Sequence, residues 1–184
     1  RSLNLNLKTE SGREVLKLLA GKADIFVENF RPGAMASLGL DYASLAKLNP
    51  KLVYVSISAF GQTGPRSGYT ASDQIIQAAS GLMAATGTPE STPLLTGAAI
   101  IDYSTGLTGA LATASALLVR NQTGRGQHVD VAMSDVAMSL FSNQAVAYLR
   151  HGILPKPNGN DFDRATVGAY NTKDGLVMLS AISV

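Results

Sequence analysis

Two helix–strand pairs follow one another in the first third of the chain, and this order constrains the fold more than any other feature. Residues 10–22 carry apolar side chains at helical spacing, and residues 24–28 form a short apolar strand. Residues 41–48 predict a second helix, and residues 51–58 are rich in the β-branched side chains that buried strands favour. Strands that alternate with helices pair in parallel, because each helix returns the chain to the edge where the strand began. The order therefore predicts an α/β fold with a parallel sheet.

The later part of the chain continues in the same way. We expect three helices and three strands there: helices over 72–81, from Asp102 or a neighbour to about 121, and over 134–150, and strands at 127–133 and on either side of a turn at 173–175. The polar stretch 152–164 contains Pro155 and Pro157 and predicts a connection between two domains. We therefore expect the central part of a large α/β domain over residues 1–151, and a linker with the start of a small domain over residues 152–184.

Both ends of the sequence have the pattern of a longer chain that has been cut. Leu3, Leu5 and Leu7 alternate with polar residues, which predicts a half-buried strand already under way at the first residue. The chain does not begin with Met, and its last ten residues predict another strand with nothing after it. We therefore expect an internal piece of a longer protein.

Composition and charge exclude several classes of function. The formal net charge is +2 and no basic cluster occurs, so the sequence does not predict a nucleic-acid partner. No apolar run reaches the roughly 18 residues that a membrane span needs, and a chain without Cys has no thiol chemistry. His128 and His151 stand too far apart in the sequence to predict a metal site. We expect no nucleic acid, no membrane and no metal.

Asp102 is the residue with the most consequence for function. It follows an apolar run and stands just before a long Ala- and Leu-rich helix. One interpretation is a helix N-cap, whose carboxylate accepts hydrogen bonds from the next turn. The other is a nucleophile, because a helix N-terminus favours the ionised carboxylate, and an ionised carboxylate can attack a thioester. The sequence pattern is compatible with both.

A second candidate is the turn Asn29-Phe-Arg-Pro-Gly33. It follows one strand and leads into a helical segment, so its backbone N–H groups suit an anionic ligand. Arg31 would add a bidentate contact to a phosphate. The alternative is an ordinary strand-to-helix turn.

Taken together, seven stretches of the chain resemble the class III CoA-transferase family, which includes formyl-CoA and carnitine CoA-transferases and the related α-methylacyl-CoA racemases. They occur in the family's order and cover almost the whole chain: residues 1–8, 27–33, 48–54, 58–65, 77–81, 102–106 and 123–127. The resemblance implies a Rossmann-like large domain, a second smaller domain and a homodimer of two interlocked subunits. Family members are about twice as long, so we expect this piece alone to be inactive.

The resemblance also implies roles for individual residues. Asp102 matches the family's nucleophilic aspartate, which would form first an acyl-aspartyl anhydride and then an aspartyl-CoA thioester. Coenzyme A enters as the acyl-CoA substrate, a small carboxylic acid is its partner in the exchange, and no metal is implied. The residues that match the family's CoA site are Asn6, Lys8, Asn29, Phe30, Arg31, Ser72, Asp73 and Gln74.

Two alternatives to the transferase stay open. The related racemases carry a His at the position of Ser72, and a Ser cannot act as a base near neutral pH, so Ser72 favours the transferase. A non-catalytic CoA-binding protein is the other alternative, against which the retention of Asp102 argues. We expect a cytoplasmic location; a mitochondrial one stays open because the chain does not begin with Met.

Overall fold

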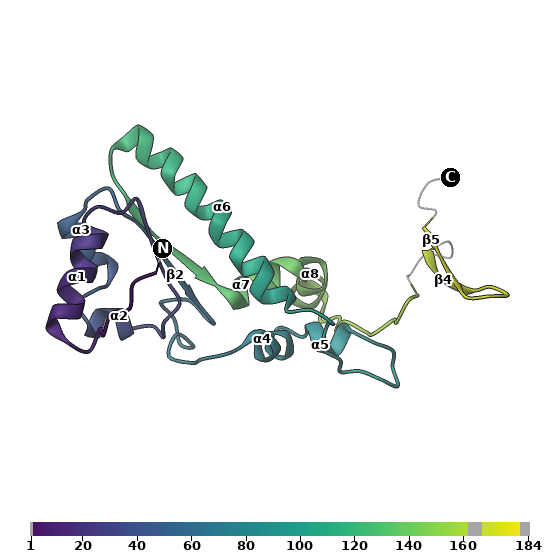
Figure 1. The fold of residues 1–184 in the computed structure, drawn as a ribbon. Helices are drawn as coiled ribbons and strands as arrows, with labels where there is room; N and C mark the ends of the chain where they lie inside the picture. Colours follow the sequence, from purple (N-terminus) through teal and green to yellow (C-terminus); the bar gives the residue numbers. More distant parts are fainter. Residues whose placement is uncertain (1, 162–166, 181–184) are drawn as a thin grey trace. The chain divides into compact units, whose positions relative to one another are not determined.

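A parallel sheet is the framework of the first part of the chain (Figure 1). The computed structural model describes residues 2–161 and 167–180. In these residues the sheet has three strands, with β2 in the middle: β1 (Ile25–Glu28), β2 (Val53–Ser58) and β3 (Gln127–Ala132). Both neighbouring pairs are parallel, and Val55 stands opposite Val27 on one side and Val129 on the other. The predicted α/β fold with a parallel sheet is confirmed.

Contacts divide the chain into two units. The first is Arg1–Ile76 with Ala99–Leu140, and the second is Gln77–Ala98 with Phe141–Val184. The helices that begin in the first unit are α1 (Glu10–Ala20), α2 (Ala34–Ser37), α3 (Tyr42–Leu48), α4 (Asp73–Ala79), α6 (Ile100–Thr123) and α7 (Met133–Leu140). The domain division expected after residue 151 stays a prediction.

The middle strand β2 is packed on both of its faces. On the face of α1 and α3, Tyr54 stacks on Phe26 with 5.0 Å between ring centroids and donates from its hydroxyl to the carbonyl oxygen of Leu40 at 3.1 Å. Burial, reinforced by the nearby Glu28 carboxylate, raises the pKa of the Tyr54 phenol. On the other face Val55 packs in one cluster with Ala116 of α6. Alternate residues of β2 therefore enter two different cores.

Both α1 and α6 run antiparallel to the strands. The Asn49 side-chain nitrogen donates to the carbonyl oxygen of Ala23 at 2.8 Å, which holds the end of α1 beside the start of β2. In the last turn of α6, Arg120 Nη1 donates to the carbonyl oxygens of Asp24 and Lys51 and lies 3.0 Å from the Asp24 carboxylate. The ends of both helices thus lie at the amino edge of the sheet, and their starts lie at its carboxyl edge.

Helix α6 is longer than the strands it covers. Its 24 residues span about 36 Å, whereas the six residues of β2 span about 20 Å. Gly109 still lies on the sheet, because a Cβ built there would be 3.7 Å from Ile57 and 4.0 Å from Val131. The first two turns of α6 therefore extend past the carboxyl edge.

In its described residues, the second unit has two helices that begin in it and one hairpin. The helices that begin in it are α5 (Leu82–Ala85) and α8 (Ser142–His151). Its strands β4 (Val167–Asn171) and β5 (Leu176–Ser180) pair antiparallel, with Ala169 opposite Met178. The two final strands that the sequence predicts are thus present.

Two sequence predictions of secondary structure are wrong. The alternating leucines do not form a strand, because Thr9 donates to the carbonyl oxygen of Asn6 through both its N–H and its hydroxyl and turns the chain into α1. The helix expected over 134–150 is divided at Phe141, whose φ of −109° and ψ of 26° depart from helical values. No helix in the described ranges is long and apolar enough to cross a membrane.

Candidate functional site at the carboxyl edge of the sheet

The structure brings the predicted site residues to one edge of the sheet. Asn29, Phe30 and Arg31 follow β1 directly, and Asn6 and Lys8 precede α1, whose start lies at the same carboxyl edge. Asp102 lies in the first turn of α6, and Asp73 of α4 is hydrogen-bonded to that turn. Ser72 and Gln74 flank Asp73 and are exposed. Open parallel α/β sheets bind their ligands outside the carboxyl ends of the strands, so this edge is the candidate site.

Asp102 is not the N-cap of α6. The helix begins at Ile100, its N-cap position is Ala99, and Ala99 makes no side-chain capping hydrogen bond. The Asp73 carboxylate oxygen Oδ2 accepts instead from the N–H groups of Ile101 at 2.8 Å and of Asp102 at 3.0 Å. The capping interpretation of Asp102 is therefore wrong, because a carboxylate from another helix occupies that role.

The Asp102 carboxylate is exposed and accepts no hydrogen bond from any residue that the structure describes. It stands at the third helical position of α6, close to the partial positive charge of the helix N-terminus. It also lies in the part of α6 that extends past the sheet. A carboxylate in this place, without a partner among the described residues, is free to contact a ligand at the carboxyl edge.

The turn after β1 is fixed by its own side chains. The Asn29 side-chain nitrogen donates to the carbonyl oxygen of Ile57 at 2.6 Å, which ties the end of β1 to β2. The buried Glu28 carboxylate accepts from the N–H of Phe30 at 2.8 Å. One N–H of the predicted anion site, that of Phe30, is thus already occupied, and the following helix α2 has only four residues. The anion site itself stays a prediction. Sequence reasoning missed Glu28, although a buried acid at a strand end is a recognisable signal.

Two side chains of this turn are available to a ligand. Phe30 is 51% exposed, and Arg31 is exposed and forms no ion pair with any described residue. An exposed aromatic ring next to a free guanidinium can hold a ring and a phosphate together. These two exposed side chains are the candidate ligand contacts of the turn.

Asn6 and Lys8 belong to a turn and not to a strand. The Asn6 side-chain oxygen accepts from the N–H of Lys8 at 3.0 Å, and Arg13 of α1 donates to the carbonyl oxygens of Leu7 and Lys8. The backbone of this segment is thus held on the start of α1. The Lys8 side chain is exposed, so its ammonium remains available at the carboxyl edge.

Three buried side-chain atoms in the described residues have no hydrogen-bond partner, and the residues that carry them lie in sequence motifs at this edge. They are Ser58 Oγ at the end of β2, Gln62 Nε2 in the following loop and Thr105 Oγ1 one turn after Asp102. Buried polar groups in native proteins are nearly always satisfied, so these three atoms mark the edge as a place where polar partners fit. Sequence reasoning did not single out these residues, although all three lie within stretches that it used.

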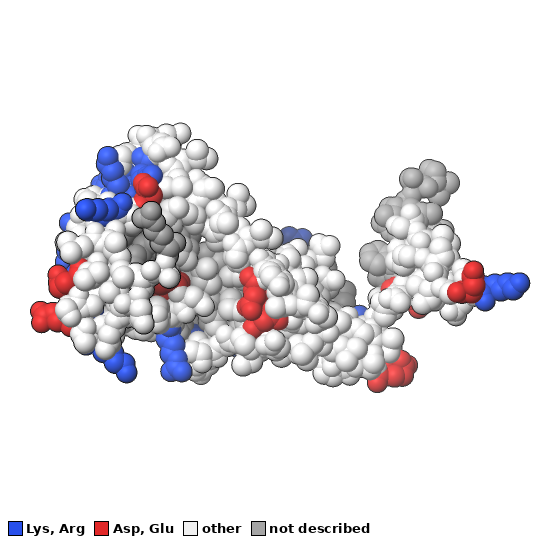
Figure 2. Space-filling view, in the orientation of Figure 1, with Lys and Arg blue, Asp and Glu red and all other residues white. Residues whose placement is uncertain are grey.

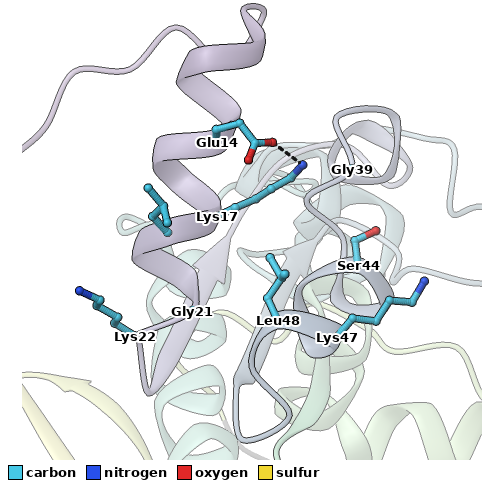
Figure 3. Close-up of a pocket in the computed structure, with 9 residues that line it drawn as sticks. Glu14, Lys17, Gly21, Lys22, Gly39, Ser44, Lys47 and Leu48 are labelled. Atoms are coloured by element: carbon cyan, nitrogen blue, oxygen red, sulfur yellow. Dashed lines mark hydrogen bonds and ion pairs between the residues drawn. The ribbon is translucent and has the colours of Figure 1, made fainter.

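A separate hollow lies between α1 and α3, near their C-terminal ends (Figure 3). It has a volume of about 690 Å³, and the Lys17 ammonium in its wall forms an ion pair with Glu14 at 2.8 Å. Lys22 and Lys47 also line it. Figure 2 shows Lys and Arg side chains gathered over the part of the molecule where Figure 1 labels α1 and α3. Cations near helix C-termini are favourable in themselves. None of the predicted site residues lines this hollow.

His128 has structural partners in β2 and α3. Its Nε2 lies 2.9 Å from Ser56 Oγ, and its ring stacks on Tyr42 with 5.5 Å between centroids. Within the parts of the chain that the structure describes, no group of three potential metal ligands occurs.

The fold and the residues at the carboxyl edge of the sheet define the class of protein. It is a parallel α/β domain with an exposed carboxylate, cationic side chains and unpartnered polar groups at the edge where such sheets bind ligands. The sequence pattern described as CoA-transferase family III matches residues 1–183. The chain belongs to this family.

Relatives with assigned names are CoA-transferases. The chain is 39% identical over 183 residues to the succinate–glutarate CoA-transferase of Agrobacterium fabrum, covering 98% of this chain and 45% of the relative. It is 43% identical over 160 residues to the acetyl-CoA:oxalate CoA-transferase of Acetobacter aceti, covering 86% and 41%. The chain thus spans less than half the length of these curated relatives. Their names indicate an enzyme family.

Solved structures share the fold. A CAIB/BAIF family protein from Brucella suis superposes with a TM-score of 0.87 at 41% identity, over 96% of this chain and 47% of that one. A hypothetical protein from Mycobacterium tuberculosis gives a TM-score of 0.88 at 32% identity, over 100% of this chain and 50% of that one. The α/β fold therefore corresponds to about half of each solved chain.

Proposed function

We propose that the complete protein transfers CoA from an acyl-CoA thioester to a free carboxylic acid, with Asp102 as the nucleophile. The observation that carries this proposal is the Asp102 carboxylate itself, exposed and without a hydrogen-bond partner among the described residues at the N-terminus of α6. A nucleophile must be accessible, and the partial positive charge of a helix N-terminus interacts favourably with a negative charge beside it. The names of the relatives support the reaction class.

The chemistry proceeds by exchange of acyl groups on this carboxylate. A carboxylate oxygen of Asp102 attacks the thioester carbonyl carbon, the C–S bond breaks, and the CoA thiolate leaves an acyl-aspartyl anhydride. The thiolate then attacks the aspartyl carbonyl carbon and releases the donor acid, which gives an aspartyl-CoA thioester. The acceptor carboxylate repeats both steps in reverse order and regenerates Asp102. Each step exchanges one nucleophile for one leaving group, so no net proton or electron is needed.

The carboxyl edge offers groups that suit CoA. Lys8 and Arg31 are cations without ion-pair partners in the described structure, and charge-assisted hydrogen bonds to phosphates are the strong ones. The exposed Phe30 ring suits the adenine or the pantetheine arm. Asn6, Asn29, Ser72 and Gln74 are exposed at the same edge. We propose that these residues form part of the CoA site.

Covalent trapping tests the proposed function directly. The complete protein is incubated with a panel of acyl-CoAs, quenched with hydroxylamine and analysed by peptide mass spectrometry. We expect a hydroxamate at Asp102 with at least one donor, because hydroxylamine cleaves anhydrides and thioesters of the enzyme carboxylate. No adduct with any donor, at a protein concentration where CoA binds, would contradict the nucleophile and leave a binding protein or a racemase.

The racemase makes a different prediction at the carbon next to the thioester carbonyl. That reaction needs two opposed acid–base groups, and the exposed Ser72 hydroxyl cannot serve as one near neutral pH. We therefore expect no deuterium at the α-carbon of a 2-methylacyl-CoA after incubation in D₂O. Incorporation at a catalytic rate would make the protein a racemase.

Arg31→Ala should weaken CoA binding about ten- to a hundredfold while slowing the chemical step much less, because a charged contact to phosphate contributes about 1.5–3 kcal/mol. Isothermal titration of the complete protein with free CoA measures the affinity. Lys47→Ala is the control, since Lys47 is also an exposed cation but lines the hollow at the opposite end of the helices. Equal affinities of the two variants for CoA would remove Arg31 from the site.

We also propose that the complete protein is a homodimer in the cytoplasm. One face of α6 presents Leu107, Leu111 and Leu118, which are 73%, 70% and 67% exposed, and apolar surface of this kind is usually covered by another polypeptide. Sedimentation equilibrium of the complete protein should give the mass of two chains, and a monomer mass would contradict it. Fractionation of the source cells tests the compartment.

A further inference from the structure

Asp73 provides the N-terminal cap that helix α6 lacks in its own sequence. An N-cap side chain normally accepts from the N–H groups of the second and third helical residues. In α6 these are Ile101 and Asp102, and both donate to the single oxygen Oδ2 of Asp73, at 2.8 and 3.0 Å. The residue at the N-cap position, Ala99, has no polar side chain to offer. A residue 29 positions before Asp102 therefore completes the helix start.

The Asp73 cap is buried, although the side chain of Asp102, whose N–H it accepts, is not. Asp73 is 2% exposed and Ile101 is completely buried, whereas Asp102 is exposed. Removing an acceptor from buried N–H groups leaves them unsatisfied, and the backbone shifts to find another partner. An acidic side chain at the third helical position can bond back to the N-cap N–H, which is a structural use open to Asp102. With Asp73 at the helix start, the Asp102 side chain accepts no hydrogen bond from the described residues.

We propose that Asp73 is a positioning residue for the transfer reaction, which fixes the backbone of Ile101 and Asp102 so that the Asp102 carboxylate stays free and correctly placed. The proposal rests on the function proposed above. The proposed role of Asp73 differs from that of its exposed neighbours Ser72 and Gln74. Those two side chains face solvent at the carboxyl edge, whereas Asp73 acts through its hydrogen bonds to α6. A displacement of about 1 Å at a reacting group can lower a rate about a hundredfold, so a cap that holds the nucleophile matters for turnover.

The test compares two substitutions of Asp73 with a matched structural control. Asp73→Ala removes the acceptor, whereas Asp73→Asn keeps a side-chain oxygen that can accept both N–H groups. Asn49→Ala is the control, because Asn49 also bonds two backbone groups through one atom, the carbonyl oxygens of Ala20 and Ala23, at the other end of the same unit. All three variants are made in the complete protein, and kcat and KM for the acyl-CoA are measured.

We expect Asp73→Ala to lower kcat about ten- to a hundredfold with KM changed less than about twofold, the pattern of a lost transition-state geometry. Asp73→Asn should keep kcat within about threefold, and Asn49→Ala should leave kcat unchanged. A raised KM with normal kcat in Asp73→Ala would make Asp73 a substrate contact. The positioning role would also be overturned if Asn49→Ala lowered kcat as much as Asp73→Ala does. The same holds if Asp73→Asn lowered kcat as much as Asp73→Ala.

Amide hydrogen exchange separates this proposal from the proposed function. In the complete protein, Asp73→Ala should speed exchange at Ile101 and Asp102 at least about tenfold, while Asp73→Asn should not. If exchange responds in this way but the wild-type protein transfers no CoA, the cap stands and the proposed function fails. If exchange at both amides is unchanged in Asp73→Ala, the cap does not hold the helix start and the positioning proposal is wrong.

Discussion

Replacing Asp102 by Ala should reduce CoA transfer by the complete protein at least about a thousandfold, while CoA still binds. No other described residue of α6 offers a carboxylate at this edge, and removing a covalent nucleophile commonly costs this much or more. Steady-state transfer between an acyl-CoA and a free acid measures the rate, and titration with CoA measures the binding. Asp102→Asn should be equally inactive, because the amide keeps the shape and loses the nucleophilic oxygen.

Asp135→Asn is the matched control for this experiment. Asp135 is also an exposed aspartate in the first turn of a helix of the first unit, α7. Its substitution should leave transfer within about twofold, because it removes the same charge from a similar position without removing the proposed nucleophile. If both Asp102 variants retained CoA transfer, the covalent mechanism through Asp102 would be wrong.

Gly126→Ala should destabilise the 184-residue chain by about 3 kcal/mol or more, the largest effect that we expect on folding. Gly126 joins α6 to β3 and donates from its N–H to the carbonyl oxygen of Pro50 at 2.8 Å. A Cβ built on Gly126 would overlap the backbone carbonyl group of Leu52, and backbone cannot move aside as a flexible side chain can. Urea unfolding followed by circular dichroism gives the free energy of unfolding.

The control for this substitution is Gly68→Ala. A Cβ built on Gly68 has no heavy atom within 4 Å, so the change should alter the free energy of unfolding by less than about 1 kcal/mol. If Gly126→Ala proved as mild as the control, the close approach between Gly126, in the connection from α6 to β3, and Leu52, just before β2, would have to be wider than the structure has it. That result would also question the position of α6 on the sheet.

The elements between residues 10 and 58 could be predicted because each carries its own signal. The apolar spacing of α1 and the β-branched residues of β2 are local patterns, and the cores on both faces of the sheet reinforce them. The alternation of Leu3, Leu5 and Leu7 is equally local, but a strand also needs a neighbour to pair with. Here the Thr9 cap turns the chain into a helix before a strand forms. Residues 134–150 contain no Gly or Pro, so no local sequence signal predicts the division at Phe141.

The candidate site could be predicted by residue type but not by role. Motifs identified Asp102, Asp73 and Arg31, and topology explains why all three reach the carboxyl edge. That Asp73 caps α6 depends on contact between residues 29 positions apart, which no local pattern contains. The use of the Phe30 N–H by Glu28 is local, but it competes with the anion site that the same turn predicts. The roles assigned to the site residues stay predictions until the variants are measured.

Helix α6 is held by hydrogen bonds at each of its two ends. Arg120 fastens one end to Asp24 and Lys51, and Asp73 fastens the other beside Asp102. The 18 residue steps from Asp102 to Arg120 correspond to about 27 Å of helix, so a tilt of one degree about the Arg120 end would move Asp102 by about 0.5 Å. That displacement equals the tolerance of a catalytic group. Substitution of Arg120 should therefore alter turnover by tilting α6 and moving Asp102, although Arg120 makes no contact with the substrate.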